Sequence, residues 1–217
     1  MIYAVIFDQD GTLMDSGPGI KHTAIETLKQ MNLPYLPYEE MDYFIGPPLS
    51  DCFRLSDVPE ERIPEAVKLY RIRYKQQGMF EEEVYPGILS LLFKLRQAGY
   101  QTYVATSKSK RLAEAILIHF QMRSLFDGVF GASEGIQGES KATIIASCLS
   151  TLPKESKVIM VGDTYLDILG AKENHIPAIG VTYGYGEKVR MRENGCSLWA
   201  KNAEELEQIL LSRLKAN

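Results

Sequence analysis

The chain has 217 residues, of which 45% are hydrophobic and 24% are charged, a composition typical of folded globular proteins and unlike that of disordered, collagen-like or disulfide-scaffold chains. At roughly 100–200 residues per domain, this length suits one domain with a large insertion or two modest domains. The formal net charge of -4 gives no electrostatic basis for a nucleic-acid partner or an anionic membrane. Any phosphate-bearing ligand would therefore be held by a local site.

The cysteines and the N-terminal stretch indicate the cellular compartment. Cys52, Cys148 and Cys196 are scattered and form no C-x-x-C pair, which argues against a zinc site and a disulfide framework and favours a reducing cytoplasm. The first residues are apolar but lack a basic lead, and they reach Asp8 before a signal core or a membrane span could be completed. We therefore expect a cytoplasmic protein whose chain opens with a strand.

Short apolar runs separated by helical patterns predict a parallel sheet. The first run ends at Phe7, directly before the turn sequence Asp-Gln-Asp-Gly-Thr. The later strand candidates, in chain order, are 100–105, 128–132, 157–161 and 178–181. Because strands that alternate with helices form parallel sheets covered by helices, the sequence predicts an α/β fold.

The stretch 15–83 follows a different pattern. Its apolar residues recur at helical spacing and no strand candidate lies between them. Pro86-Gly87 marks the return to the α/β body. The sequence thus predicts an α/β domain formed by 1–14 and 84–217, with a helical domain formed by 15–83 inserted into it.

Polar residues follow the predicted strands at what should be one edge of the sheet, where parallel α/β sheets bind their ligands. These residues are Asp8, Asp10, Thr106, Ser107, Lys108, Asp163 and Asp167. Crowded carboxylates repel one another unless a cation neutralises them. Oxygen ligands without histidine or cysteine favour Mg²⁺, which often bridges protein carboxylates to a substrate phosphate. The sequence therefore predicts a magnesium site and a phosphate-bearing substrate.

Four segments resemble the motifs of haloacid-dehalogenase-superfamily phosphatases. They are Asp-Gln-Asp-Gly-Thr-Leu at 8–13, Thr-Ser-Lys at 106–108, Lys141, and Gly-Asp-Thr-Tyr-Leu-Asp at 162–167. The resemblance spans nearly the whole chain. It implies a doubly wound, Rossmann-like parallel-sheet core with an inserted all-helical cap domain.

Further segments resemble the phosphoglycolate-phosphatase-like branch of that superfamily, which carries a helical cap. They are Asp15-Ser16, Gly46-Pro47-Pro48, Pro86-Gly87 and the late sequence Gly-Val-Thr-Tyr-Gly-Tyr-Gly at 180–186. Gln9 departs from the branch, which usually has an apolar residue there. Strand alternation points this side chain away from the ligand, so we expect little effect on the chemistry.

The resemblance also implies catalytic roles. Asp8 would be the nucleophile that accepts the phosphoryl group, and Asp10 the general acid and base, two residues away on the same face of an extended segment. Asp163 would bind Mg²⁺ together with Asp8 and the backbone carbonyl of Asp10. Asp167, four residues later, would be a metal ligand acting through water.

Thr106 and Lys141 complete the catalytic candidates, and Thr106, Ser107, Gly46 and Arg54 are candidates for substrate binding. Thr106 would hydrogen-bond the transferring phosphoryl group and Lys141 would place a positive charge on it, as the resemblance implies. Ser107 and Gly46 would contribute to the substrate site, and Arg54 could bind an anionic substrate tail bidentately. The alternatives are a helix cap for Thr106 and solvated side chains for Lys141 and Arg54.

The leading functional hypothesis is a magnesium-dependent phosphatase that hydrolyses a small phosphomonoester, with a phosphoglycolate-like compound as the best single candidate. A sugar phosphomutase of the same fold, which passes the phosphoryl group to a sugar, is the nearest alternative. From a different class, a phospho-acceptor receiver module also uses an aspartate, a metal and a lysine. A catalytically idle sensor is a further alternative, although every catalytic position is filled. A receiver, however, accepts phosphate after its third strand and has no large insertion.

Overall fold

The computed structural model describes residues 2–133 and 139–215, with side chains up to residue 212. The chain folds as two compact units, one formed by Met1–Met14 and Val84–Asn217 and the other by Asp15–Glu83. Two short strands, β2 (Met14–Asp15) and β3 (Glu83–Val84), pair with each other where the chain passes between the units.

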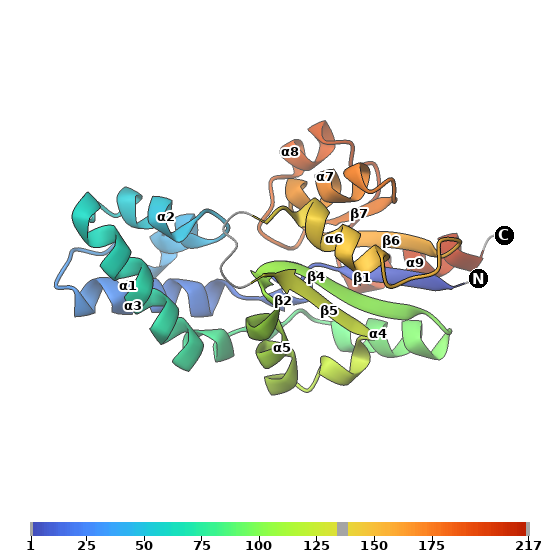
Figure 1. Cartoon of the computed structure of the whole chain (residues 1–217), viewed down its shortest axis with the longest axis horizontal. Coiled ribbons are helices and arrows are strands. Elements are labelled where there is room, and N and C mark those ends of the chain that lie inside the picture. The colour runs from blue at the N-terminus through green and yellow to red at the C-terminus, as the bar shows by residue number, and fades with distance from the viewer. Residues whose placement is uncertain (1, 134–138, 216–217) are drawn as a thin grey trace. The chain divides into compact units, whose positions relative to one another are not determined.

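The α/β unit is built on a six-stranded sheet in the order β5-β4-β1-β6-β7-β8, with all neighbouring strands parallel (Figure 1). The strands are β1 (Tyr3–Phe7), β4 (Gln101–Ser109), β5 (Gly128–Ala132), β6 (Lys157–Gly162), β7 (Ala178–Val181) and β8 (Trp199–Ala200). The predicted α/β fold is therefore confirmed. The sequence did not indicate β8, and β4 continues past the predicted 100–105 as far as Ser109.

Helices cover both faces of this sheet, so it is doubly wound as predicted. They are α4 (Ile88–Gln97), α5 (Lys110–His119), α6 (Lys141–Leu149), α7 (Tyr165–Glu173), α8 (Lys188–Glu193) and α9 (Ala203–Lys215), with the 3₁₀ turn η4 (Arg123–Leu125). The chain runs outward from β1 through β4 to β5, then returns to β6 and runs outward on the other side. Because such crossovers are right-handed, α4 and α5 lie on one face and α6 and α7 on the other (Figure 1).

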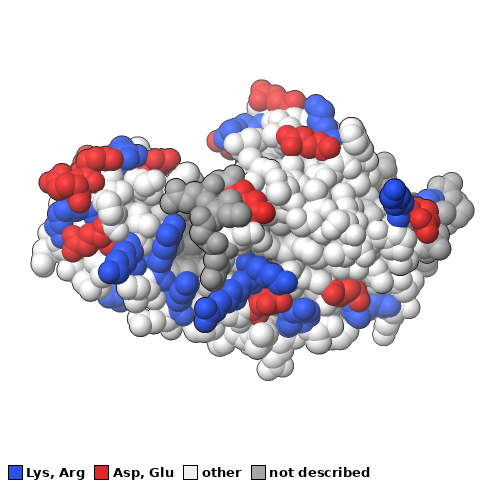
Figure 2. Space-filling view, viewed as in Figure 1, with Lys and Arg blue, Asp and Glu red and all other residues white. Residues whose placement is uncertain are grey.

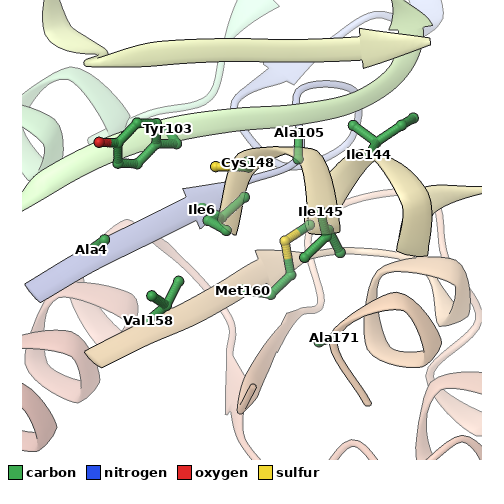
Figure 3. Close-up of a cluster of buried hydrophobic side chains, with 10 residues drawn as sticks. All are labelled: Ala4, Ile6, Tyr103, Ala105, Ile144, Ile145, Cys148, Val158, Met160 and Ala171. Carbon is green, nitrogen blue, oxygen red and sulfur yellow. The ribbon is translucent and has the colours of Figure 1, made fainter. Parts of the chain in front are cut away.

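One part of the core lies between the sheet and the α6–α7 pair (Figure 3). Ala4 and Ile6 of β1 and Met160 of β6 point to this face and pack against Ile144 and Ile145 of α6. All five side chains are buried. Alternate residues of β1 thus anchor the strand whose carboxyl end precedes Asp8.

The second unit is helical between its short end strands. Its elements are α1 (Gly17–Gln30), η1 (Tyr38–Phe44), α2 (Leu49–Leu55), η2 (Glu60–Arg62), α3 (Ile63–Gln76) and η3 (Gly78–Phe80). Phe44, Phe53 and Tyr70 form its aromatic core, with the Phe44 and Phe53 ring centroids 5.2 Å apart. Gly19 lets α1 approach η3, because a Cβ there would lie 1.9 Å from the carbonyl oxygen of Gly78.

Figure 2 shows acidic and basic side chains on both units, as the small net charge of the chain suggests. Among the described residues, no helix is both long enough and apolar enough to cross a membrane.

Candidate active site

Five of the predicted site residues meet at the carboxyl edge of the parallel sheet. Asp8 follows β1, Thr106 lies in β4, and Asp163 follows β6. Lys141 is the first residue of α6, and Asp167 lies in the first turn of α7. All five are buried. Parallel strands place their carboxyl ends at one edge, so residues far apart in the sequence converge here.

Three carboxylates form the centre of this site. Asp8, Asp163 and Asp167 each offer a carboxylate oxygen, and these oxygens lie within 4.8 Å of one another. Burial raises the pKa of Asp8 well above its ordinary value; Lys141 opposes this rise, and the charges of Asp167 and Asp163 add to it. Burial, with Asp167 adding to the effect, raises the pKa of Asp163 to about 7. The cluster is therefore short of positive charge.

Lys141 supplies one positive charge to the cluster. Its Nζ lies 2.7 Å from Oδ1 of Asp8 and 2.9 Å from Oδ1 of Asp167, and it donates a hydrogen bond of 3.1 Å to the carbonyl oxygen of Ala105. Burial alone would lower the pKa of this lysine, but Asp167 and Asp8 raise it above its ordinary value. Lys141 is buried and paired, and the alternative of a solvated lysine does not describe it.

The donor set fits a hard divalent cation. One ammonium group among three carboxylates leaves an excess of negative charge, which a divalent cation would neutralise. The cluster offers oxygen ligands from Asp8, Asp163 and Asp167 and contains neither histidine nor cysteine. This chemistry suits Mg²⁺ or Ca²⁺ and disfavours zinc.

Asp167 has a structural task besides its place in the cluster. Its Oδ2 accepts hydrogen bonds from the backbone N–H and the hydroxyl of Thr164, at 3.0 and 2.9 Å, which closes the N-terminus of α7. Its Oδ1 faces Lys141. Asp167 thus fixes both the start of α7 and the lysine that contacts Asp8.

Asp10 lies apart from the three buried carboxylates. It is half-buried, and its Oδ1 contacts the Nζ of Lys108, the third residue of the Thr-Ser-Lys motif. The sequence singled out Lys108 as part of that motif but assigned it no role. The structure pairs it with the predicted general acid and base.

Thr106 and Ser107 differ in exposure. Thr106 is buried, and its Oγ1 accepts a hydrogen bond of 3.2 Å from the backbone N–H of Lys108. Ser107 is exposed at the same strand end. Ser109, and not Thr106, occupies the N-cap position of α5.

Gly46 and Arg54 belong to the helical unit. Gly46 is exposed with φ +105°, in the left-handed region that favours glycine. Arg54 forms hydrogen bonds of 2.8 and 3.0 Å with both oxygens of Glu60 and one of 2.7 Å with Asp51. An anionic ligand of Arg54 would therefore compete with two carboxylates.

The loop after β7 also contributes to the site. The backbone N–H of Tyr185 donates a hydrogen bond of 2.8 Å to Oδ2 of Asp163, and the hydroxyl of Tyr183 donates one of 2.9 Å to the carbonyl oxygen of Thr12. Thr12 in turn donates to Oδ1 of Asp163 at 3.2 Å. The sequence signal for this loop was the resemblance of 180–186 to the phosphoglycolate-phosphatase-like branch.

Known proteins are similar to this chain in sequence and in fold. A family model described as haloacid dehalogenase-like hydrolase matches residues 5–181. A haloacid dehalogenase-like hydrolase structure from Streptococcus pneumoniae superposes with a TM-score of 0.86 at 32% identity, covering 99% of each chain. The predicted resemblance to this superfamily is confirmed.

Three relatives of similar sequence are named for three different activities. The chain is 33% identical over 210 residues to a 5'-nucleotidase of Pseudomonas aeruginosa, covering 96% of this chain and 95% of that protein. It is 36% identical over 183 residues to tyrosine-protein kinase PtkA of Mycobacterium tuberculosis, covering 84% of this chain and 62% of that protein. It is 28% identical over 191 residues to a phosphoglycolate phosphatase of Caulobacter vibrioides, covering 85% and 81%.

Proposed function

The chain belongs to the haloacid dehalogenase-like hydrolase family, and on that basis we propose that it is a magnesium-dependent phosphatase that hydrolyses a small phosphomonoester through an aspartyl-phosphate on Asp8. The observation that carries this proposal is the buried contact between Asp8 and Lys141 beside two further carboxylates. A carboxylate nucleophile, a fixed positive charge and a place for a divalent cation are what phosphoryl transfer requires.

In the first step, an oxygen of Asp8 attacks phosphorus as the bond to the leaving alkoxide breaks. Asp10 gives its proton to that alkoxide, and then takes a proton from the water that hydrolyses the aspartyl-phosphate. Lys141 stays beside Asp8 and stabilises the charge that develops on the phosphoryl oxygens, while Thr106 donates a hydrogen bond to them. Lys108, in contact with Asp10, holds its carboxyl group at the edge of the site.

Asp8, Asp163 and the backbone carbonyl of Asp10 would hold Mg²⁺, with Asp167 acting through water. When bound, the ion neutralises charge on the transferring phosphoryl group. Support comes from the all-oxygen donor set and from the raised pKa of Asp8 and Asp163, because a cation would relieve the repulsion behind part of that rise.

The helical unit 15–83 would act as a cap that excludes bulk water and selects the leaving group. Its candidate substrate residues are Gly46 and Arg54, and Ser107 is a candidate on the α/β unit beside Thr106. The exposure of Ser107 at the strand end supports its place in this proposal. Arg54 would exchange one of its carboxylate partners for an anionic group of the substrate.

Two substrate classes are favoured by specific relatives. A phosphoglycolate-like compound is supported by the relative of that name at 28% identity, and a nucleoside 5'-monophosphate by the 5'-nucleotidase at 33% identity over nearly the full length of both proteins. The partner is in either case a small phosphate ester. A cytoplasmic location is consistent with free, buried Cys52, Cys148 and Cys196.

The test is release of inorganic phosphate by the purified full chain from 2-phosphoglycolate, nucleoside 5'-monophosphates and hexose phosphates, with Mg²⁺ or with EDTA. We expect release from at least one of the first two, only with Mg²⁺. Isomerisation of a hexose phosphate without phosphate release would identify a phosphomutase. No release from any ester, or full release in EDTA, would overturn the proposal.

A further inference from the structure

Asp163 is enclosed by two loops of the α/β unit. Gly11 lies in the turn after β1, and Gly184 and Gly186 lie in the loop after β7. A Cβ on Gly11 would lie 2.1 Å from Oδ2 of Asp163, one on Gly184 would lie 2.5 Å from that oxygen, and one on Gly186 would lie 1.8 Å from the carbonyl oxygen of Asp163. Side chains at these three positions would occupy the space of the aspartate. The two loops can close on Asp163 because all three positions are glycine.

The same two loops donate hydrogen bonds to the Asp163 carboxylate, one to each oxygen. Thr12, next to Gly11, donates its hydroxyl to Oδ1, and Tyr185, between the two other glycines, donates its backbone N–H to Oδ2. Both donors are neutral. They fix the direction of the carboxylate without supplying the positive charge that it lacks.

A third hydrogen bond ties the two loops together. The hydroxyl of Tyr183 donates to the carbonyl oxygen of Thr12 at 2.9 Å, and its ring packs edge-on against Tyr85 with centroids 4.8 Å apart. The tyrosine therefore links the loop that donates to Oδ2 with the residue that donates to Oδ1. The turn bonded by Tyr183 also contains Asp8 and Asp10.

We infer that Tyr183 is a positioning residue of the metal site, whose hydroxyl clamps the loop after β7 onto the turn after β1 so that Asp163 and Asp8 face one cation. The inference rests on the proposed magnesium site. Neither Tyr183 nor Thr12 would touch the substrate or the cation. Removing the clamp should loosen Asp163 and weaken cation binding more than it weakens the fold.

Tyr183→Phe tests this by removing only the hydroxyl, since a phenyl ring can keep the packing against Tyr85. The matched control is Tyr103→Phe in β4, whose hydroxyl donates at 2.9 Å to Oε1 of Gln101. The readout is Mg²⁺ binding to the full chain by calorimetry, with the melting temperature of the metal-free protein measured beside it. Loss of a group that orients a metal ligand typically weakens metal affinity by about 10–100-fold.

We expect Tyr183→Phe to bind Mg²⁺ about tenfold more weakly than the parent protein, and Tyr103→Phe to bind it like the parent. Thr12→Val, which removes the hydrogen bond to Oδ1 of Asp163, should show a similar loss and keeps the test valid if Tyr183→Phe does not fold. Unchanged affinity in Tyr183→Phe, or in Thr12→Val where that variant replaces it, would overturn the inference alone. A parent protein that binds no Mg²⁺ would overturn the inference together with the proposed magnesium dependence.

Discussion

The Nζ of Lys141 lies 2.7 Å from Oδ1 of Asp8, and neither side chain is more than about a tenth exposed. The lysine is the first residue of α6 and the aspartate directly follows β1, so the contact depends on the packing of that helix on the sheet. Removing one partner of a buried ion pair typically costs about 3–5 kcal/mol, because the other charge stays buried without compensation.

We therefore expect Lys141→Met to lower the free energy of unfolding of the metal-free protein by a few kcal/mol and to abolish phosphatase activity. Lys94→Met is the control, because Lys94 pairs with Glu207 at the surface, where such pairs contribute about 0–1 kcal/mol. Urea denaturation and phosphate release measure the two effects. An active Lys141→Met enzyme would remove this lysine from the catalytic site.

Mg²⁺ should stabilise the folded chain. At a concentration 100 times its dissociation constant, a ligand that binds only the folded state adds about 2.7 kcal/mol. We expect the melting temperature to rise with Mg²⁺ and to return to its starting value with EDTA. Asp163→Asn should lose this rise, whereas Asp127→Asn, which alters a surface pair with Arg96, should keep it. An equal rise in both variants would place the ion elsewhere.

Arg54→Ala should change which phosphomonoesters are used, because Arg54 is the candidate for binding an anionic tail. Its three contacts with Asp51 and Glu60 are exposed, so we expect little change in the free energy of unfolding. Relative rates across the substrate panel are the measurement. Arg62→Ala, which alters another exposed pair of the helical unit, is the control. Identical substrate profiles for the parent and Arg54→Ala would show that this arginine does not select substrates.

Gln9→Met should stabilise the protein. Gln9 is fully buried, and neither its Oε1 nor its Nε2 has a hydrogen-bond partner among the described residues. A buried polar group without a partner costs about 1–3 kcal/mol, and methionine fills a similar volume without polar atoms. We expect a higher urea midpoint with unchanged catalytic rate. A lower midpoint would mean that the amide is satisfied in solution.

The sequence predicted the catalytic and metal-binding residues of the site better than the residues that position them. Asp8, Lys141 and Asp163 were predicted because they lie in motifs placed directly after strands or at a helix start. The tasks of Tyr183 and Lys108 were not predicted, because they arise from contacts between segments far apart in the chain. The hydrogen bond from the Tyr183 hydroxyl to the carbonyl oxygen of Thr12 cannot be inferred from residue spacing or hydrophobic periodicity.

Secondary structure that depends on contacts between distant segments was also not predicted from the sequence. Ile88, Leu91, Leu92 and Leu95 recur at helical spacing, and all four are buried in α4. The strand β8 (Trp199–Ala200) has two residues, too few for an alternating pattern, and it pairs with β7 at the edge of the sheet. The extension of β4 beyond Thr106 depends on Gly131, where a Cβ would lie 2.6 Å from the carbonyl oxygen of Lys108.

Asp8 and Asp10 should respond differently to the same substitution. Asp8→Asn removes the nucleophile, so no phosphoryl-enzyme should form. Asp10→Asn keeps the nucleophile and the backbone carbonyl expected to bind Mg²⁺, but it loses proton transfer, which is typically worth about 10²–10⁴ in rate for each step that it serves. Both formation and breakdown of the aspartyl-phosphate should slow with an alkyl phosphate.

A substrate with a good leaving group separates the two steps. An aryl or acyl phosphate needs little protonation, so Asp10→Asn should regain the first step with it but not the second, which still requires activation of water. Phosphorylated Asp10→Asn should then accumulate, visible as one added phosphate in the mass of the intact protein. Asp8→Asn is the matched control and should stay unmodified. A phosphoryl adduct on Asp8→Asn would show that Asp8 is not the nucleophile, because only the nucleophile can carry the phosphoryl group. Turnover of Asp10→Asn at the parent rate would show that Asp10 is not the general acid and base, because loss of that group must slow release of the phosphoryl group.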